Sequence, residues 1–144
     1  MNFIFNKKKL QDMHTTISLY KKFDRYKDTT KEELFYHILP SFKLNQYKIH
    51  KNGDNVIAFT NWAFLDQKAE DNFMKTGKVN SWNCGNKAWH VDTICVKDIR
   101  KVMAWTKKYF TNLLGLGKPV HWLRLDDYNK IYRKVTQYTK EIYK

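Results

Sequence analysis

The sequence predicts one α/β domain over residues 1–144, with a central mixed β-sheet flanked by helices on both sides. The first observation is a hairpin, because Asn52-Gly53-Asp54 joins two strand-like segments with residues that tolerate positive φ. The second is a strand-like segment, 87–96, followed by the best helical pattern in the chain and another strand-like segment. Such a crossover is right-handed and makes its strands parallel, whereas the hairpin is antiparallel. A hydrophobic content of 42% suffices for one core.

The N-terminal part predicts two helices. Residues 13–27 carry a weak helical stripe of apolar side chains at spacings of three, namely Ile17, Tyr20 and Phe23. A clearer helix opens at Thr30, because Thr30 and Glu33 form a capping-box pattern ahead of an apolar face. We expect this helix to end at Pro40, since proline removes a backbone donor and clashes with the preceding turn.

The middle of the chain predicts the hairpin and a short helix. The hairpin strands are expected at 47–51 and 55–61, on either side of the Asn-Gly-Asp turn. Asp66 is placed to cap the following helix, and Gly77 is placed to end that helix in the left-handed conformation.

The C-terminal part predicts the crossover and a last helix. Residues 98–114 have apolar side chains at helical spacing and Gly115 as a stop signal. Residues 119–125 supply the next strand. We then expect Asp126 to cap a basic terminal helix with a buried stripe formed by Ile131, Val135, Tyr138 and Ile142.

The net charge is the strongest compositional signal. The 27 Lys and Arg against 14 Asp and Glu give a formal charge of +13, which speeds encounters with acidic partners. Nucleic acid, an anionic membrane face and an acidic protein all fit this charge. A solvated lysine-rich surface without a partner is an equal alternative, because a charge count carries no geometry.

The sequence favours a cytoplasmic protein. No stretch has the length and hydropathy of a membrane helix, and the charges near Met1 follow the apolar residues rather than precede them. Cys84 and Cys95 lack the spacing of a zinc site or a disulfide framework, so we expect no metal. Cys95, on a strand, is expected to be a small buried apolar residue.

Several short motifs resemble those of the toxin-activating lysine acyltransferases, the family that acylates internal lysines of RTX toxins. Their order and spacing agree with the family's. The most specific match is a run of tryptophan, glycine, tryptophan and aspartate, in register with the family's tryptophan, serine-glycine-aspartate, tryptophan and catalytic aspartate: Trp82, Gly85, Trp89 and Asp92. The other matches are Leu39-Pro40, Asn45-Gln46-Tyr47, Asn61-Trp62-Ala63 and Arg124.

This resemblance implies a GNAT-like acyltransferase fold and a reaction that moves a fatty acyl group from acyl carrier protein to a lysine amine. No bound cofactor is implied, because the acyl carrier protein is the donor. The partners would be an acidic carrier protein and a protein that carries the acceptor lysine. The compact, lysine-rich chain looks most like short relatives in bacteriophage genomes, which implies the host cytoplasm as its location.

The resemblance also implies a catalytic pair of histidine and aspartate, because a lysine amine must lose a proton before it attacks a thioester. The aspartate is Asp92. Counting back from Pro40 places the family's histidine at Tyr26, whose ordinary pKa makes it a poor base. His90 is the first substitute to test, since residues two apart on a strand share a face. His14 and His37 could approach only through the tertiary fold, and we expect His37 to be a half-buried residue with its hydrogen bonds satisfied.

Basic residues suggest where a carrier would bind. Lys97 and Arg100 lie at the expected start of the helix 98–114, where free N–H groups can bind phosphate. The family's alanine-proline-phenylalanine-glycine turn is replaced there by Cys95 to Arg100. Arg124 is a candidate oxyanion or phosphopantetheine contact. Solvated basic residues at an ordinary helix start are an equally good interpretation for Lys97 and Arg100.

Three hypotheses of function follow. The first is an N-acyltransferase that takes an acyl chain from acyl carrier protein to a protein lysine. The second is a catalytically silent relative that acts as a binding or virion-associated phage protein, which the absent family histidine favours. The third is a basic nucleic-acid-binding protein, the weakest because no recognised binding motif is present. The sequence leaves a homodimer open.

Overall fold

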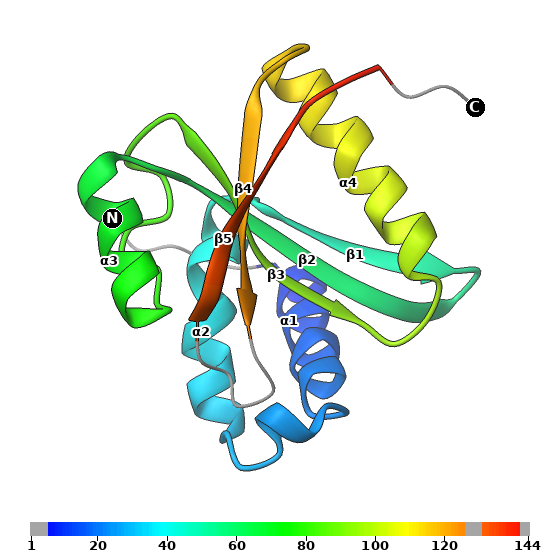
Figure 1. The fold of residues 1–144 in the computed structure, drawn as a ribbon. Helices are drawn as coiled ribbons and strands as arrows, with labels where there is room; N and C mark the ends of the chain where they lie inside the picture. Colours follow the sequence, from blue (N-terminus) through cyan, green and yellow to red (C-terminus); the bar gives the residue numbers. More distant parts are fainter. Residues whose placement is uncertain (1–5, 126–130, 142–144) are drawn as a thin grey trace.

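The computed structural model describes residues 6–125 and 131–141. Figure 1 shows its helices and strands. The helical elements are α1 (Lys7–Tyr20), the 3-10 turn η1 (Asp24–Tyr26), α2 (Lys31–Lys43), α3 (Gln67–Thr76) and α4 (Ile99–Leu114). The strands are β1 (Tyr47–Asn52), β2 (Asn55–Leu65), β3 (Lys87–Cys95), β4 (Pro119–Leu125) and β5 (Ile131–Tyr138). No helix in the described ranges has the length and apolar character needed to cross a bilayer.

The sheet is mixed, as the sequence predicts. Among the described residues it has five strands in the order β1-β2-β3-β4-β5. β1 and β2 form the predicted antiparallel hairpin, with Gly53 at φ 59° in its turn. β3 and β4 are parallel and joined by α4, so the predicted crossover is confirmed.

Helices cover both faces of the sheet, and neighbouring residues of β2 show which helix covers which face. Phe59 packs in the largest apolar cluster with Tyr20 of α1 and Phe42 of α2. Ala58, the preceding residue, packs against Val102 of α4. Because successive strand residues point to opposite faces, α1 and α2 cover one face and α4 covers the other. Figure 1 shows α1 and α2 together, away from α4.

Several predicted helix boundaries are confirmed and have visible causes. Thr30 and Glu33 form the capping box in full at the start of α2. Asp66 caps α3 by accepting a hydrogen bond from the backbone N–H of Ala69 at 2.8 Å. Gly77 ends α3 with a φ of 74°, the left-handed conformation expected of it.

Two predicted helices have other boundaries. The first helix spans Lys7–Tyr20 rather than 13–27, because the side chain of Asn6 caps its start. α2 does not end at Pro40 but continues to Lys43. Its last turn is held by burial, since Ser41 and Phe42 are both fully inaccessible to solvent, and this outweighs the donor that proline lacks.

The predicted terminal helix is wrong. Residues 131–138 form β5, which pairs antiparallel with β4 from Pro119↔Tyr138 to Leu125↔Ile131. The pairing satisfies the backbone donors and acceptors along the outer edge of β4, which a helix there would leave unpaired. The predicted cap at Asp126 and the stripe residue Ile142 lie outside the described residues.

The sheet has two irregularities, both of which involve β3. The register of β2 and β3 shifts between Asn61 and Trp62, which is a β-bulge. In addition, β3 and β4 pair at only two positions among the described residues, Ala88↔Val120 and Trp89↔His121. Both strands run on beyond this point, so the sheet opens into a split between them.

Candidate active site

Asp92 lies at the centre of a cluster of polar side chains on the face covered by α1 and α2. Its Oδ2 atom lies 2.7 Å from Nε2 of His37 on α2. The hydroxyl of Tyr20, at the end of α1, donates to the same oxygen at 2.7 Å. The packing of the two helices on β3 therefore places an imidazole and a phenol on one carboxylate.

The backbone around Asp92 is fixed by Asn61 on β2. The backbone N–H of Asp92 donates to Oδ1 of Asn61 at 2.8 Å, and Asn61 is fully buried. This side chain takes up a donor at the bulge, where the ladder between the strands is interrupted. The Asn61 position belongs to one of the motifs singled out in the sequence.

The charges of the pair support each other. Burial alone would raise the pKa of Asp92, but His37 and the Tyr20 hydroxyl outweigh it and hold that pKa below its usual value of 3.8. The Asp92 carboxylate raises the pKa of His37 above 6.5, against an opposing effect of burial. Burial, followed by the Asp92 charge, raises the pKa of Tyr20 well above 10.0, so Tyr20 remains a hydrogen-bond donor.

His37 is more exposed to solvent than Asp92 and Tyr20. Its side chain is 40% exposed, whereas that of Asp92 is 15% exposed and Tyr20 is fully buried. With Nε2 directed at the carboxylate, that nitrogen carries the proton of the neutral ring, and Nδ1 keeps the lone pair. No described residue forms a hydrogen bond with Nδ1. An imidazole that is oriented by a carboxylate and has its other nitrogen open to solvent can accept a proton from a bound molecule.

His90 does not join this cluster. The expectation that His90 and Asp92 share a face is wrong, because the bulge intervenes. Asn61 pairs with Asp92, but Trp62 pairs with His90, so Val91 is an extra residue that reverses the alternation. His90 points to the α4 face, is 5% exposed, and has a pKa lowered to about 4 by burial.

Tyr26 lies near the cluster as part of its packing. Its ring is edge-on to that of Tyr20, with centroids 4.9 Å apart. Burial, with a further contribution from the Asp92 charge, raises the pKa of Tyr26 to about 12. A phenol with that pKa is protonated at neutral pH and does not serve as a base there.

The three basic residues predicted to bind the carrier or its phosphopantetheine are all exposed on the surface. Lys97 and Arg100 are exposed on either side of Asp98, at the start of α4. Arg124 is exposed on β4, opposite Arg133 of β5. No hydrogen bond of these side chains is found among the described residues.

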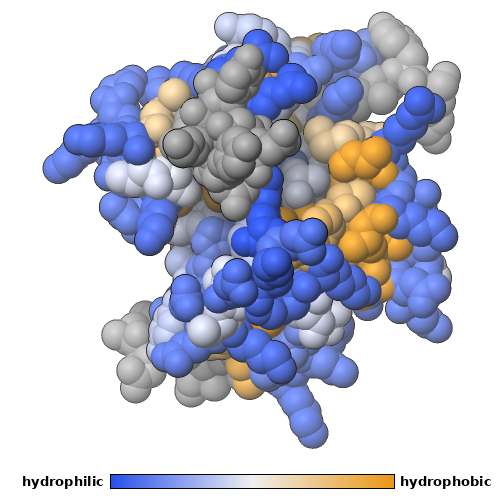
Figure 2. Space-filling model, turned by 60° about the horizontal axis from the view of Figure 1, so that its bottom comes forward, coloured by the Kyte–Doolittle hydropathy of each residue, from blue (hydrophilic) through white to orange (hydrophobic). Residues whose placement is uncertain are grey.

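The start of α4 has unusual geometry. Asp98 adopts the left-handed conformation, with a φ of 60°, and its side chain makes no capping hydrogen bond to α4. Its carboxylate instead accepts a hydrogen bond from the side-chain amide of Asn52. Val96 and Ile99 expose 45% and 50% of their surface beside the basic residues. On the face drawn in Figure 2, hydrophobic residues gather in one area of a mainly hydrophilic surface.

The two cysteines are not equally placed. Cys95 is partly buried at the end of β3, and its Sγ contacts the backbone carbonyl of Lys97 at 3.1 Å. Cys84 is exposed and lies 3.4 Å from the backbone nitrogen of Asp66. Neither thiol contacts Asp92 or His37.

Sequence reasoning missed His37 as the partner of Asp92. The sequence predicted a half-buried residue with satisfied hydrogen bonds, whereas the side chain of His37 is 40% exposed and its hydrogen bond is the one to Asp92. A signal was present: His37 lies between Leu34 and Ser41 at helical spacings of three and four, and both are buried. His37 therefore lies at the margin of the buried face of α2, from which its side chain can reach the sheet.

Comparisons with known proteins show the family and the fold. The sequence model of the RTX toxin acyltransferase family matches residues 6–139. Among solved structures, the loading GNATL domain of CurA from Lyngbya majuscula superposes with a TM-score of 0.55 at 12% sequence identity. The match covers 81% of this chain and 61% of that one, so the chain spans less than two thirds of that structure. The likeness shows a GNAT-like fold. No curated sequence matched significantly.

Proposed function

The chain belongs to the RTX toxin acyltransferase family, and on this premise we propose that it transfers an acyl group from acyl carrier protein to a lysine amine, with His37 and Asp92 as its catalytic pair. The observation that carries the proposal is the 2.7 Å contact between His37 Nε2 and Asp92 Oδ2. His37 takes the role for which the sequence suggested His90 or Tyr26. Asp92 keeps the role that the motif run gave it.

The chemistry follows from which nitrogen is free. The lone pair on Nδ1 of His37 accepts a proton from the lysine ammonium, and the neutral amine attacks the thioester carbonyl carbon. A C–N bond forms and the C–S bond breaks, so the products are the acylated lysine and the free thiol of the carrier. The attacking nitrogen loses a second proton as the amide forms. Of the two protons that His37 accepts in turn, one is released to water and the other passes to the leaving sulfur, which restores the neutral ring.

Asp92 and Tyr20 support this cycle from below. Asp92 holds the imidazole in one tautomer and stabilises the imidazolium that forms when His37 takes up the proton. Tyr20, buried and protonated, donates to the carboxylate and keeps it ionised and oriented. A carboxylate with both functions needs no direct contact with the substrate.

The positive charge has a use in this proposal. Carrier proteins are acidic, and a formal charge of +13 accelerates and orients such an encounter. Lys97 and Arg100 are the carrier-facing charges at the start of α4, and Arg124 is the candidate contact for the phosphopantetheine or the oxyanion. A carrier-protein donor also implies a reaction in the cytoplasm.

The test is an acyl-transfer assay with carrier protein that bears a radiolabelled chain and a lysine-containing protein acceptor. His37→Gln should lower the transfer rate by about 10²- to 10⁴-fold, the usual contribution of a general base. Asp92→Asn should lower it by a similar factor, because the imidazole loses the carboxylate that fixes its tautomer and stabilises its cation. His14→Gln changes an exposed histidine of α1 and serves as the matched control, with an unchanged rate. Full activity of folded His37→Gln would rule out the proposed pair, and His90→Gln would then be compared.

A further inference from the structure

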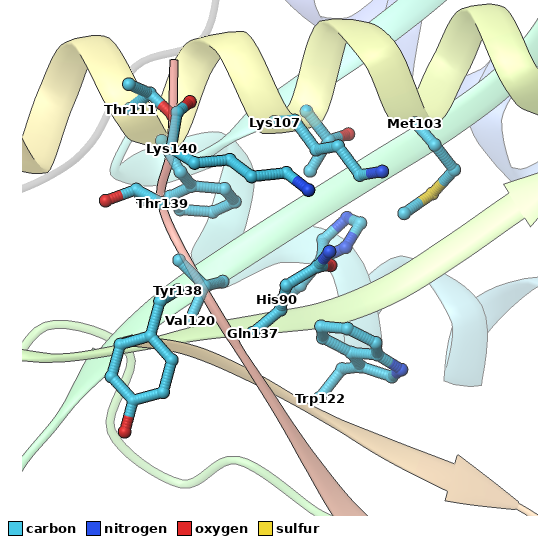
Figure 3. A pocket seen from close by; sticks show the side chains of 12 residues that line it. His90, Met103, Lys107, Thr111, Val120, Trp122, Gln137, Tyr138, Thr139 and Lys140 are labelled. Atoms are coloured by element: carbon cyan, nitrogen blue, oxygen red, sulfur yellow. The ribbon is translucent and has the colours of Figure 1, made fainter. Parts of the chain in front are cut away.

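The 21–30 segment, which links α1 to α2, lies beside the Asp92 cluster. Figure 1 shows it where the chain passes from one helix to the other. Tyr26, on this segment, packs against the apolar cluster that contains Tyr20. The pocket drawn in Figure 3 lies on the opposite face of the sheet, between α4 and the strands β4 and β5, and Asp92 does not line it. The 21–30 segment therefore contributes to the surroundings of the catalytic pair, whereas this pocket does not.

The ammonium group of Lys21 holds the 21–30 segment together. Lys21 directly follows Tyr20 at the end of α1, and its Nζ donates to three backbone carbonyls at 3.2, 2.8 and 2.6 Å, those of Tyr26, Lys27 and Thr29. Three acceptors match the three donors of an ammonium group. No carboxylate pairs with Lys21 among the residues that the structure describes. The bonds of Lys21 therefore draw the far end of the segment back to the end of α1.

Tyr26 connects Lys21 to the catalytic pair. Its carbonyl accepts a hydrogen bond from Lys21, and its ring stands edge-on to that of Tyr20, with the planes at 76°. Tyr20 in turn donates to Asp92 at 2.7 Å. The half-buried ring of Tyr26 thus covers the phenol that binds the carboxylate. Excluding water from that hydrogen bond strengthens the attraction between Asp92 and a protonated His37, because the local dielectric constant is lower.

We infer that Lys21 is a positioning residue of the transfer reaction, because it fixes the 21–30 segment so that Tyr26 keeps water away from the carboxylate of Asp92. The inference rests on the proposed function, since its consequence is the rate of that reaction. The charged groups that act on the pKa of His37 are Asp92, on β3, and Lys78, after α3. Both remain in place when Lys21 is replaced, so an effect of the replacement on His37 has to pass through the 21–30 segment.

Lys21→Met is the first test, because methionine keeps an apolar stem and removes all three donors. The pKa of the His37 ring is measured by NMR without substrate, and the resonances are identified by their loss in His37→Gln. Water that reaches Asp92 weakens its hold on the imidazolium, so the pKa of His37 should fall towards 6.5. The kcat should fall by about three- to tenfold, with both KM values within about twofold, because the substrates do not contact Lys21.

Lys22→Met is the control for charge. Lys22 is the next residue and exposed, and its ammonium group makes no hydrogen bond or ion pair within the described ranges. It should leave the rate and the pKa of His37 unchanged. Lys21→Arg should restore most of the rate, since a guanidinium group also donates to several carbonyls. Loss of a nearby positive charge alone would raise the pKa of His37. A raised or unchanged pKa of His37 in folded Lys21→Met would therefore overturn the inference.

Tyr26→Leu tests the route from the other end, because it removes the ring and keeps the carbonyl that Lys21 binds. It should lower the pKa of His37 in the same direction. The double variant should lower that pKa no further than the stronger single variant, since both changes act through one ring. Additive effects would overturn the route through Tyr26. If Lys21→Met does not fold, an unchanged pKa of His37 in Tyr26→Leu overturns the inference by itself.

The NMR measurement separates this inference from the proposed function, because it needs no substrate. A lowered pKa of His37 in Lys21→Met, in a protein whose wild type transfers no acyl group, would retain the effect of Lys21 on the pair and reject the reaction. Transfer by the wild type that is equally fast in Lys21→Met and Lys22→Met, with the same pKa of His37 in both, would reject the role of Lys21 alone.

Discussion

Tyr20 and Asp92 lie 72 positions apart in the sequence and are joined by a 2.7 Å hydrogen bond from the phenol to Oδ2 of the carboxylate. The same oxygen contacts His37. Oδ2 of Asp92 therefore contacts two side chains: Tyr20, which holds the carboxylate in place, and His37, which the carboxylate orients. Through this oxygen, Tyr20 at the end of α1 helps to position His37 of α2.

The first prediction concerns Tyr20→Phe, which removes only this hydroxyl. A hydrogen bond to a charged group contributes about 1.5–3 kcal/mol, so the free energy of unfolding should fall by about that amount in urea titrations. The transfer rate should fall less than in Asp92→Asn, because His37 keeps its partner. The pKa of Asp92 should rise, since one of the donors that lower it is lost. An unchanged acid limb of the stability profile would contradict this role.

The second prediction is the direction of the pH dependence. Asp92 raises the pKa of His37 above 6.5, and the base must be neutral to act. The rate should therefore rise with pH through an inflection above 6.5, and Asp92→Asn should move that inflection to lower pH. Because lysine substrates also titrate, the His37 ring should be followed by NMR in the absence of substrate. A ring pKa at or below 6.5 in the wild type would refute this arrangement.

The same pair makes stability depend on pH. A histidine with a raised pKa in the folded state contributes stability that is complete below its unfolded value, near 6.5, and is lost as the pH rises through the folded value. The pH at which His37 becomes an active base is thus the pH at which its contribution to folding declines. His37→Gln should remove this part of the stability profile, and His14→Gln should preserve it.

The architecture could be predicted where the signal is local, and β5 shows where it is not. The hairpin turn, the capping box and Gly77 act through adjacent residues, and the structure confirms all three. Ile131, Val135 and Tyr138 have spacings that suit a helix, yet the segment is a strand. What decides between the two is the free edge of β4, and this is a property of the assembled sheet.

One residue of the site, Asp92, could be predicted from the sequence, but its partner His37 could not. Asp92 could be identified because its motif is continuous in sequence, whereas its contact with His37 spans 55 positions and depends on how α2 packs on β3. Alternation along the strand suggested His90 instead. That argument holds for a regular strand, and a single extra residue at Val91 reverses it. A bulge of this kind has no sequence signature in the chain.

The third prediction concerns the buried carboxylate of Glu70, which is 4% exposed. It accepts a hydrogen bond from Nε1 of Trp89 at 2.8 Å, and Lys134 of β5 lies 3.4 Å away. Glu70→Ala leaves a buried indole N–H unpaired and should cost about 1–3 kcal/mol of the free energy of unfolding. Glu70→Gln keeps an acceptor and should cost less, as urea titrations will show. Equal losses would mean that packing, and not the hydrogen bond, determines the effect.

The last prediction concerns Gly85, in the segment that precedes β3. A Cβ atom added there would lie 2.4 Å from backbone atoms of Leu65 and Asp66, and backbone atoms cannot move aside as a flexible side chain can. The loop is also tied to β2, because the N–H groups of Cys84 and Gly85 both donate to the carbonyl of Phe64. Gly85→Ala should therefore lower the free energy of unfolding by about 1–3 kcal/mol, the usual cost of overpacking.

The matched control is a glycine without such neighbours. Gly53 has no atom within 4 Å of an added Cβ, but its φ is +59°, so asparagine is the fitting replacement because it tolerates that conformation. Gly53→Asn should change stability by less than about 0.5 kcal/mol. If Gly85→Ala proves as stable as Gly53→Asn, the segment moves more freely against β2 than the hydrogen bonds to Phe64 imply. The start of β3 would then be set by Trp89 and Glu70 rather than by this close backbone approach.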